Sequence, residues 1–260
     1  MDFIQLKREL PGVSPEIVFN IFGFPVSNTF LMGLFIIGLL LLFALSVRKF
    51  SVKKPSGFQT FIEFLYEGIL GLLDQISGSR KMSEKLLPLI GSLFVYIGLS
   101  NLIELIPGLS NITLNGKQIF RSPTTDFNTT FGLAFATVAI IQMASIQSWG
   151  FFGHVGKYLQ FRRLIEGAKN GFADFFMAFI EFLIGMTDII SDVAKIISLS
   201  FRLFGNIYAG QVMAIIMLGA LAYLLPAVWS SLGIFFGLVQ AIVFGSLAAT
   251  YFMIAVKPEE

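Results

Sequence analysis

The 260-residue sequence has no cysteine and only one histidine, His154. The lack of cysteine excludes disulfides, thiolate metal sites and cysteine nucleophiles, and a single histidine excludes a metal site made of several imidazoles. Charged residues are also few, at 13%, whereas a soluble domain usually has about 25%. The chain lacks a phosphate-binding loop of the G-x-x-x-x-G-K-[ST] type. We therefore expect no cofactor, no resident metal and no nucleotide site on this chain.

Apolar residues dominate what is present. They make up 55% of the sequence, which includes 30 phenylalanines and 25 glycines, and the mean hydropathy is +0.81. Glycine is tolerated in membrane helices, so its abundance agrees with a chain whose main solvent is lipid. We expect an all-α polytopic membrane protein with about five transmembrane helices and one amphipathic helix on the membrane surface.

The first part of the chain predicts one span and one surface helix. Residues 1–25 are interrupted by prolines and predict a short segment with one helical turn after Ser14. Residues 26–47 form the first expected span, and the basic residues that follow it place the N-terminus on the outer side. Residues 57–77 repeat apolar side chains at spacings of three and four, opposite three carboxylates. This pattern predicts an amphipathic helix rather than a span.

The later part of the chain predicts the remaining spans. We expect spans over 86–106, 127–149 and 227–256. Residues 172–223 contain no proline, and as one helix they would extend about 75 Å at 1.5 Å per residue. The hydrocarbon core is only about 30 Å thick. This segment must therefore tilt strongly or break into a hairpin, and Pro226 is expected to end it.

The domain organisation follows from these spans. We expect a single transmembrane domain over residues 26–256, an outer-side segment over 1–25 and a cytoplasmic tail over 257–260. The tail is cytoplasmic if the segment 172–223 crosses the membrane once.

A line of polar side chains runs along the segment 172–223. At about 100° per residue these side chains fall within a sector roughly 80° wide on one helix face. The members are Asp174, Glu181, Asp188, Asp192, Lys195, Arg202 and Asn206. A soluble amphipathic helix with an ion-paired surface is the alternative, but the surrounding apolar spans favour a membrane helix. Polar groups in such a helix are costly and therefore indicate function.

Four features resemble one known family. The segment 198–211, SLSFRLFGNIYAGQ, resembles the most diagnostic segment of subunit a of the F-type ATP synthase. The sequence NLIELIP at 101–107 resembles that family's NL-x-x-LIP ending, and PTTDFNTT at 123–130 resembles its PT-x-D-x-NTT start. Gln240 stands in the last helix, where the family carries a glutamine that faces its essential arginine. The features occur in the family's order over roughly residues 26–256, which is stronger evidence than a single motif.

The resemblance implies the stator half of a rotary ion channel. In this family, two long tilted helices form a hairpin against a ring of c subunits, each with one carboxylate at mid-membrane. Two half-channels pass protons or sodium ions to and from the ring, and ring rotation drives ATP synthesis in an attached catalytic head. The subunit is not an enzyme on its own.

The resemblance also implies partners and a location. The implied partners are the c-ring, the b-subunit peripheral stalk, the remaining synthase subunits and membrane lipid, with no nucleic acid. The implied location is a bacterial inner membrane, with an organellar inner membrane as the alternative.

Arg202 has the central role that the resemblance implies. A guanidinium stays charged because its pKa is above ~12. Facing the ring, it keeps an arriving carboxylate ionised, and its fixed charge blocks leakage between the half-channels. Without the resemblance, a buried ion pair with Asp188 or Asp192 would explain Arg202 as well.

The entry side is expected to be unusual. Asn206 and Gln240 carry amides that can hold water or orient the guanidinium, although plain interhelical hydrogen bonds would explain them too. Gln211 and Gly233 stand where many relatives have titratable residues, so both positions are neutral here.

Two carboxylates near the outer face, Glu104 and Asp126, remain to receive cations. A charge among lipid headgroups is the alternative for Glu104. For Asp126 the alternative is a helix cap, and one residue can serve as both cap and channel.

The exit side has more carboxylates. Asp188 stands 14 residues before the arginine, where the family has a carboxylate linked to the cytoplasmic half-channel. Asp192 and Lys195 are one turn apart and are expected to pair. Glu181 and Asp174 extend the line, and a solvated interfacial face explains them equally well.

Two other functions fit a polytopic chain. A secondary transporter would use Arg202 to bind an anionic substrate, but such proteins favour repeated halves, and no internal repeat is visible. A membrane scaffold without ion transport would tolerate Arg202→Ala.

Overall fold

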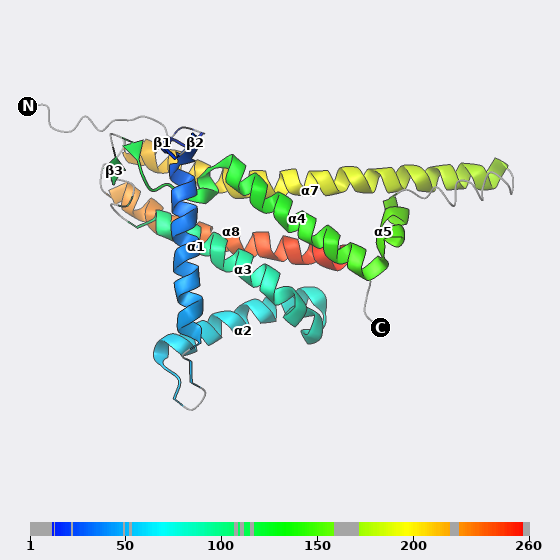
Figure 1. Cartoon of the computed structure of the whole chain (residues 1–260), viewed down its shortest axis with the longest axis horizontal. Helices are drawn as coiled ribbons and strands as arrows, with labels where there is room; N and C mark the ends of the chain where they lie inside the picture. The colour runs from blue at the N-terminus through cyan, green and yellow to red at the C-terminus, as the bar shows by residue number, and fades with distance from the viewer. Residues whose placement is uncertain are drawn as a thin grey trace, which may run out of the picture. The chain divides into compact units, whose positions relative to one another are not determined.

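The computed structural model describes residues 12, 14–21, 23–48, 50, 51, 54–106, 109, 112–114, 117–158, 172–218 and 224–256. The elements in chain order are β1 (Ile17–Ile21), β2 (Phe24–Ser27), α1 (Asn28–Val47), α2 (Gly57–Ser77), α3 (Arg80–Glu104), β3 (Thr113–Leu114), β4 (Lys117–Gln118), the 3-10 turn η2 (Pro123–Thr125), α4 (Phe127–Trp149), α5 (Phe151–Tyr158), α7 (Phe172–Leu218) and α8 (Leu224–Ala255). They are labelled in Figure 1.

The chain forms two compact units. The first comprises Met1–Thr130 and Phe201–Ser246, and the second comprises Phe131–Ser200 and Leu247–Glu260. The helices α4, α7 and α8 each contribute a part to both units.

The first unit begins with a β-hairpin where a helical turn was predicted. Strands β1 and β2 pair antiparallel, with Ile21 opposite Phe24, and Gly23 adopts a left-handed φ of 86° in the turn. The predicted turn after Ser14 was wrong, because β-branched and aromatic residues favour strands and glycine supplies the tight reversal. The side chain of Ser27 then accepts a hydrogen bond from the backbone N–H of Phe30 and starts α1.

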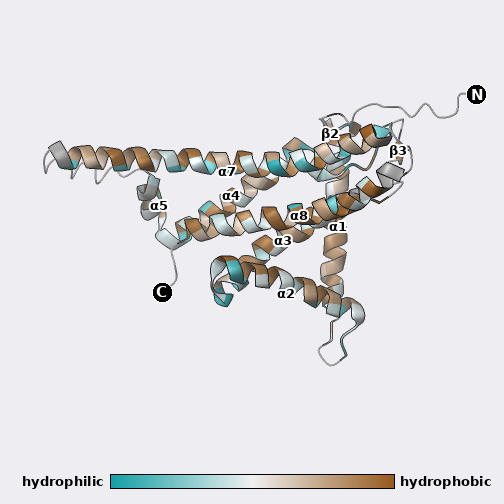
Figure 2. Ribbon diagram, turned by 180° about the vertical axis from the view of Figure 1, so that it is seen from behind, coloured by the Kyte–Doolittle hydropathy of each residue, from teal (hydrophilic) through white to brown (hydrophobic). Residues whose placement is uncertain are grey.

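Helix α1 packs through a narrow part of its surface. Met32 and Ile36 lie in a buried cluster with Ile103 of α3. Most of the remaining surface of α1 is exposed and apolar, and Figure 2 shows hydrophobic colours along the helix. Such a surface suits lipid contact.

Helix α2 confirms the predicted range 57–77. Ser56 caps its start, and Gly78, with a φ of 69°, ends it in the left-handed conformation. Its exposed face carries Phe58 and Phe61, as an amphipathic surface helix requires.

Helix α3 packs against α2 and begins earlier than predicted. It starts at Arg80 rather than at residue 86 and continues through Pro88. Arg80 explains the early start, since its guanidinium lies 2.9 Å from Asp74 and 3.1 Å from Glu67 and so joins the two helices.

Among the described residues, four helices are long and apolar enough to span a membrane. These candidate spans are Asn28–Val47, Arg80–Ile103, Phe127–Trp149 and Ser231–Ala255. Helix α7, which carries the polar line, is not among them.

Helix α7 is one helix of 47 residues, Phe172–Leu218, and is therefore about 70 Å long. The alternative of a hairpin inside the predicted segment was wrong. Pro226 does not end α7 either. It lies in the first turn of α8, where the missing N–H of proline needs no partner.

The second unit contains a helix that was not predicted. Gly150, with a φ of 73°, separates α4 from the short helix α5. His154 lies on α5 and is buried.

Candidate functional site

The first polar cluster lies in the first unit, where α7 meets α8. The Asn206 Nδ2 donates a hydrogen bond to the Gln240 Oε1, so the structure brings these two predicted residues together. Gln240 is only 3% exposed. Arg202 is one turn before Asn206 on α7 and is partly exposed. A permanent cation therefore stands one turn from Asn206 on the same face of α7, and Asn206 in turn contacts the neutral amide of Gln240 on α8.

Gln240 has further hydrogen-bonding capacity. Within the part of the chain that the structure describes, its buried Nε2 has no hydrogen-bond partner. A buried amide donor without a partner costs free energy, and such groups usually bind ordered water. The Gln240 Nε2 is therefore a hydrogen-bond donor in search of an acceptor at this site.

A second polar cluster of the first unit lies around Asn101 of α3. Its Nδ2 donates to the Gly237 carbonyl of α8 at 3.1 Å, and its Oδ1 accepts a hydrogen bond from the Thr124 hydroxyl at 2.8 Å. A Cβ added to Gly237 would lie 3.0 Å from the Asn101 Cβ, so glycine permits this close approach. The sequence analysis did not predict this cluster, although Asn101 opens the NLIELIP sequence. The partners of Asn101 are distant in sequence.

The neutral position Gly233 has a packing explanation. A Cβ added there would lie 3.0 Å from the Cδ2 of Leu105, the residue that follows α3. A larger side chain at 233 would therefore press on the Leu105 side chain. Nearby on the same helix, the Trp229 indole N–H donates to the Gly210 carbonyl of α7, next to the partly buried Gln211.

Asp126 is a helix cap, as predicted. Its Oδ1 accepts a hydrogen bond from the Asn128 backbone N–H at 3.0 Å. Its Oδ2 accepts from the hydroxyls of Thr29 and Thr129, each at 3.2 Å, and the residue is only 5% exposed. The carboxylate therefore joins α4 to α1 in addition to capping α4. The other outer carboxylate, Glu104, ends α3, and its side chain lies outside the described residues.

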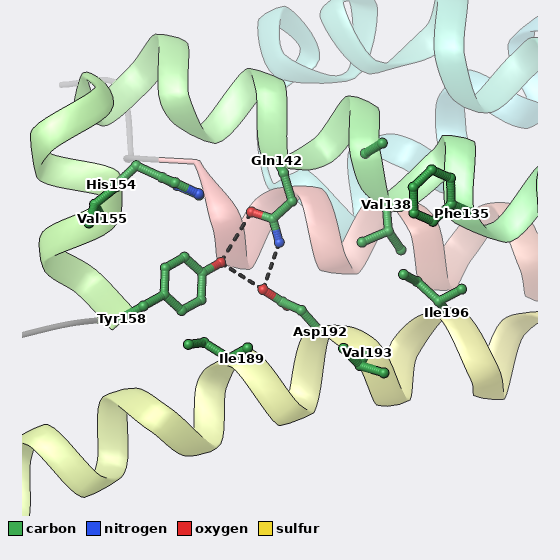
Figure 3. A pocket seen from close by; sticks show the side chains of 11 residues that line it. Phe135, Val138, Gln142, His154, Val155, Tyr158, Ile189, Asp192, Val193 and Ile196 are labelled. Carbon is green, nitrogen blue, oxygen red and sulfur yellow. Dashed lines mark hydrogen bonds between the residues drawn. The ribbon is translucent and has the colours of Figure 1, made fainter.

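The second unit contains a polar cluster around Asp192 of α7 (Figure 3). The Asp192 Oδ2 accepts hydrogen bonds from the Gln142 Nε2 and the Tyr158 hydroxyl, and its Oδ1 accepts one from the Lys195 Nζ, each at 2.6 Å. The predicted pairing of Asp192 with Lys195 is confirmed. Lys195 also lies 5.3 Å from the ring centre of Tyr251 on α8, within cation–π range.

Gln142 and Tyr158 were not predicted as site residues. They come from α4 and α5, and no spacing in the sequence places them beside Asp192. Burial of the Tyr158 phenol and its hydrogen bond to Asp192 raise the pKa of this phenol above its usual range. The phenol therefore stays neutral and acts as a hydrogen-bond donor.

A cavity of about 420 Å³ adjoins this cluster in the second unit (Figure 3). Its wall is mostly apolar, with the cluster at one side. It is lined by Phe135, Val138, Ala139, Gln142, His154, Val155, Tyr158, Ile189, Asp192, Val193 and Ile196.

The other predicted carboxylates follow one another along α7. Asp174 is exposed, and Glu181 and Asp188 are partly exposed. Seven residues separate each from the next, which is about 10.5 Å along a helix, so they do not contact one another directly. Asp188 is close enough to Tyr158 for its charge to contribute to the raised pKa of the phenol. The described residues contain no group of three or more histidines, cysteines or carboxylates that could hold a metal ion.

Comparison with known proteins gives consistent matches. The family model described as ATP synthase A chain matches residues 28–253. The ATP synthase subunit a of Desulforamulus reducens is 34% identical over 242 residues, which cover 89% of this chain and 80% of the relative. That of Moorella thermoacetica is 31% identical over 241 residues, 92% of this chain and 95% of the relative. A relative from Propionigenium modestum, named ATP synthase subunit a, sodium ion specific, is 31% identical over 245 residues, 91% of this chain and 76% of the relative.

Proposed function

Because the chain belongs to the ATP synthase A chain family, the ion-translocating membrane subunits of the synthase, we propose that it forms two half-channels that meet at Arg202. Like its relatives, it is a membrane protein of an ATP synthase complex. The observation that carries the proposal is the hydrogen bond between Asn206 and Gln240, which joins α7 to α8 one turn from Arg202. Ions pass to and from the carboxylates of a c-ring, and this flow drives rotation and ATP synthesis.

Arg202 separates the two half-channels. Its charge repels cations, so they cannot cross directly from one half-channel to the other. An arriving ring carboxylate that faces the guanidinium is stabilised in its ionised form and releases its cation. The buried amide of Gln240 orients the site through Asn206 and holds water beside it.

The entry half-channel approaches from the outer side. Neutral groups line it near the arginine, namely Asn206, Gln240 and Gln211. The carboxylates of Asp126 and Glu104 receive cations at its outer end. This division agrees with the packing at Gly233, where a larger side chain would press on Leu105.

The exit half-channel leads toward the cytoplasm along α7. Asp188 receives the leaving cation, and Asp192 and Lys195 continue the path. Glu181 and Asp174 extend it to the membrane surface. The support is the order of these groups on one continuous helix and the hydrogen-bonded carboxylate of Asp192.

The c-ring, the b-subunit peripheral stalk and membrane lipid are the proposed direct partners. The chain binds no nucleotide and catalyses no reaction alone. It lies in a bacterial inner membrane with its N-terminus outside and its C-terminus in the cytoplasm. The proposal covers protons and sodium ions alike, and ATP-driven pumping measured with and without sodium decides between them.

Arg202→Ala in the complete synthase tests the function. We expect the complex to assemble and to keep ATP hydrolysis, whereas ATP synthesis driven by an ion gradient is lost because the barrier and the counter-charge are gone. The control is Arg48→Ala, which removes an arginine just after α1 and should leave coupling intact. Full coupled synthesis by the Arg202→Ala complex would refute the proposal and favour a scaffold. Substrate uptake by the subunit reconstituted alone would favour a transporter.

A further inference from the structure

The cluster around Asp192 contains two residues to which the proposed function gives no task. Tyr158 and Gln142 lie on α5 and α4, and both bind the same oxygen of Asp192. The three side chains form the polar side of an otherwise apolar cavity (Figure 3). Polar groups placed together in such surroundings are costly and therefore indicate a task.

The Tyr158 hydroxyl has two acceptors but only one hydrogen. Its oxygen lies 2.6 Å from the Asp192 Oδ2 and 3.1 Å from the Gln142 Oε1. The hydrogen can point to either acceptor. It points to the carboxylate while Asp192 is charged, because hydrogen bonds to ionised acceptors are stronger. It can turn to the amide when that charge is neutralised.

The surrounding groups hold the phenol in place. The His154 ring packs edge-on against the Tyr158 ring, with ring centres 5.1 Å apart. The Ser145 hydroxyl donates to the Ala255 carbonyl, so the His154 Nδ1, 3.0 Å from the Ser145 Oγ, must be the donor of that bond. The contact with His154 thus holds the ring, and the Tyr158 O–H changes its acceptor by rotating about the C–O bond.

The charged and titratable groups around Tyr158 come from three elements. His154 lies on α5, and Asp188 and Asp192 lie on α7. Lys195 neutralises Asp192 from the same helix and packs over Tyr251 of α8. The neighbour on α4, Gln142, is neutral.

We propose that Tyr158 is a positioning residue of the exit path and that it makes Asp192 a transient binding site for the cation leaving toward the cytoplasm. This inference rests on the proposed function. When a proton binds the Asp192 Oδ2, the new O–H donates to the Tyr158 oxygen, and the Tyr158 O–H turns to the Gln142 Oε1. Release of the proton to water reverses both steps, so the Tyr158 phenol keeps its own proton throughout.

Tyr158→Phe in the complete synthase tests this inference. The substitution keeps the ring and removes only the hydroxyl. We expect normal assembly and ATP hydrolysis, with ATP-driven ion pumping reduced about tenfold, the factor for one lost hydrogen bond to a carboxylate. Pumping falls as rising pH removes the proton from Asp192, and the pH at which half of the rate is lost should move upward in the variant. The Asp192 carboxylate holds its proton more tightly without the Tyr158 hydroxyl as a donor. Tyr66→Phe, on the exposed surface of α2, is the control and should change neither.

The pH midpoint separates a role in the path from a purely structural one. Tyr158→Phe complexes that are less stable but pump at the normal rate with an unchanged midpoint would overturn the inference. If Tyr158→Phe does not assemble, Gln142→Leu decides, since it removes the second acceptor, and normal pumping by this variant would likewise overturn the inference. The proposed function is tested separately by Arg202→Ala. Loss of coupling there, together with normal pumping by Tyr158→Phe, rejects only the inference about Tyr158.

Discussion

At the scale of single residues, Gly233 shows how packing decides which chemistry a position can have. The Leu105 Cδ2 lies 3.0 Å from the place of a Cβ at residue 233. A long side chain at 233 therefore requires the Leu105 side chain to shift, so the two positions are coupled by packing.

Gly233→Glu should lower the stability of the subunit by about 2 kcal/mol, because the larger side chain must displace Leu105 in a close-packed contact. Leu105→Ala in the same chain should recover part of this loss. The amount of assembled complex and its thermal unfolding measure the effect. Gly233→Gln is the control for size, since it adds the same bulk without charge. Equal losses with Leu105 and with Ala at 105 would show that the two residues are not coupled.

At the scale of elements, α7 carries charged residues at a regular spacing along its length. Asp174, Glu181, Asp188, Lys195 and Arg202 recur at intervals of seven residues. In a straight helix such a repeat drifts by about 20° per interval, which sums to about 80° over the four intervals. The first and last members therefore lie at opposite edges of one helix face about 80° wide. This drift supports a division of the line into an exit part and a barrier at Arg202.

Helix α4 offers a test that separates a cap from a channel residue. Asp126→Ala should destabilise the subunit by about 1 kcal/mol, because the Asn128 N–H loses its side-chain acceptor. Asp126→Asn should destabilise the subunit less than Asp126→Ala, because asparagine keeps the cap but places an amide nitrogen where an oxygen accepts from Thr29 and Thr129. If Asp126 also receives cations, both variants should slow ATP-driven pumping, because both lack the carboxylate. Thermal unfolding and pumping of both variants give the result, and a normal pumping rate for Asn would restrict Asp126 to the cap.

Elements with strong local signals were predictable from the sequence. The range 57–77 was correct because apolar periodicity, the Ser56 cap and Gly78 agree. The start of α3 was missed because Arg80 acts through Asp74 and Glu67 of another helix. The site contacts that were missed likewise depend on residues from other helices.

Contacts of the Asp192 side chain differ in whether the sequence could signal them. The pairing of Asp192 with Lys195 followed from helical spacing. The contacts of Gln142 and Tyr158 with Asp192 depend on three helices and leave no local pattern.

At the scale of the whole molecule, the path through the membrane depends on α7. The helices α1, α3, α4 and α8 qualify as spans by length and composition within the described residues, and α7 does not. If α7 also crosses, the number of crossings is odd and the two termini lie on opposite sides. If it lies along the membrane surface, the number is even and both termini lie on the same side. Its length of about 70 Å, more than twice the hydrocarbon thickness, permits a crossing only with a strong tilt.

The lack of cysteine makes this path directly measurable, because each introduced thiol is the only one in the chain. We expect a thiol at Lys117→Cys, in the β3–β4 hairpin that the proposed orientation places outside, to react with a membrane-impermeant maleimide in intact cells. A thiol at Ser79→Cys, between α2 and α3, and one at Glu260→Cys should react only after permeabilisation. The unmodified chain is the control for background labelling, and normal coupled synthesis by each variant confirms correct insertion. Labelling of Glu260→Cys in intact cells, with the other two as expected, would show that α7 does not cross.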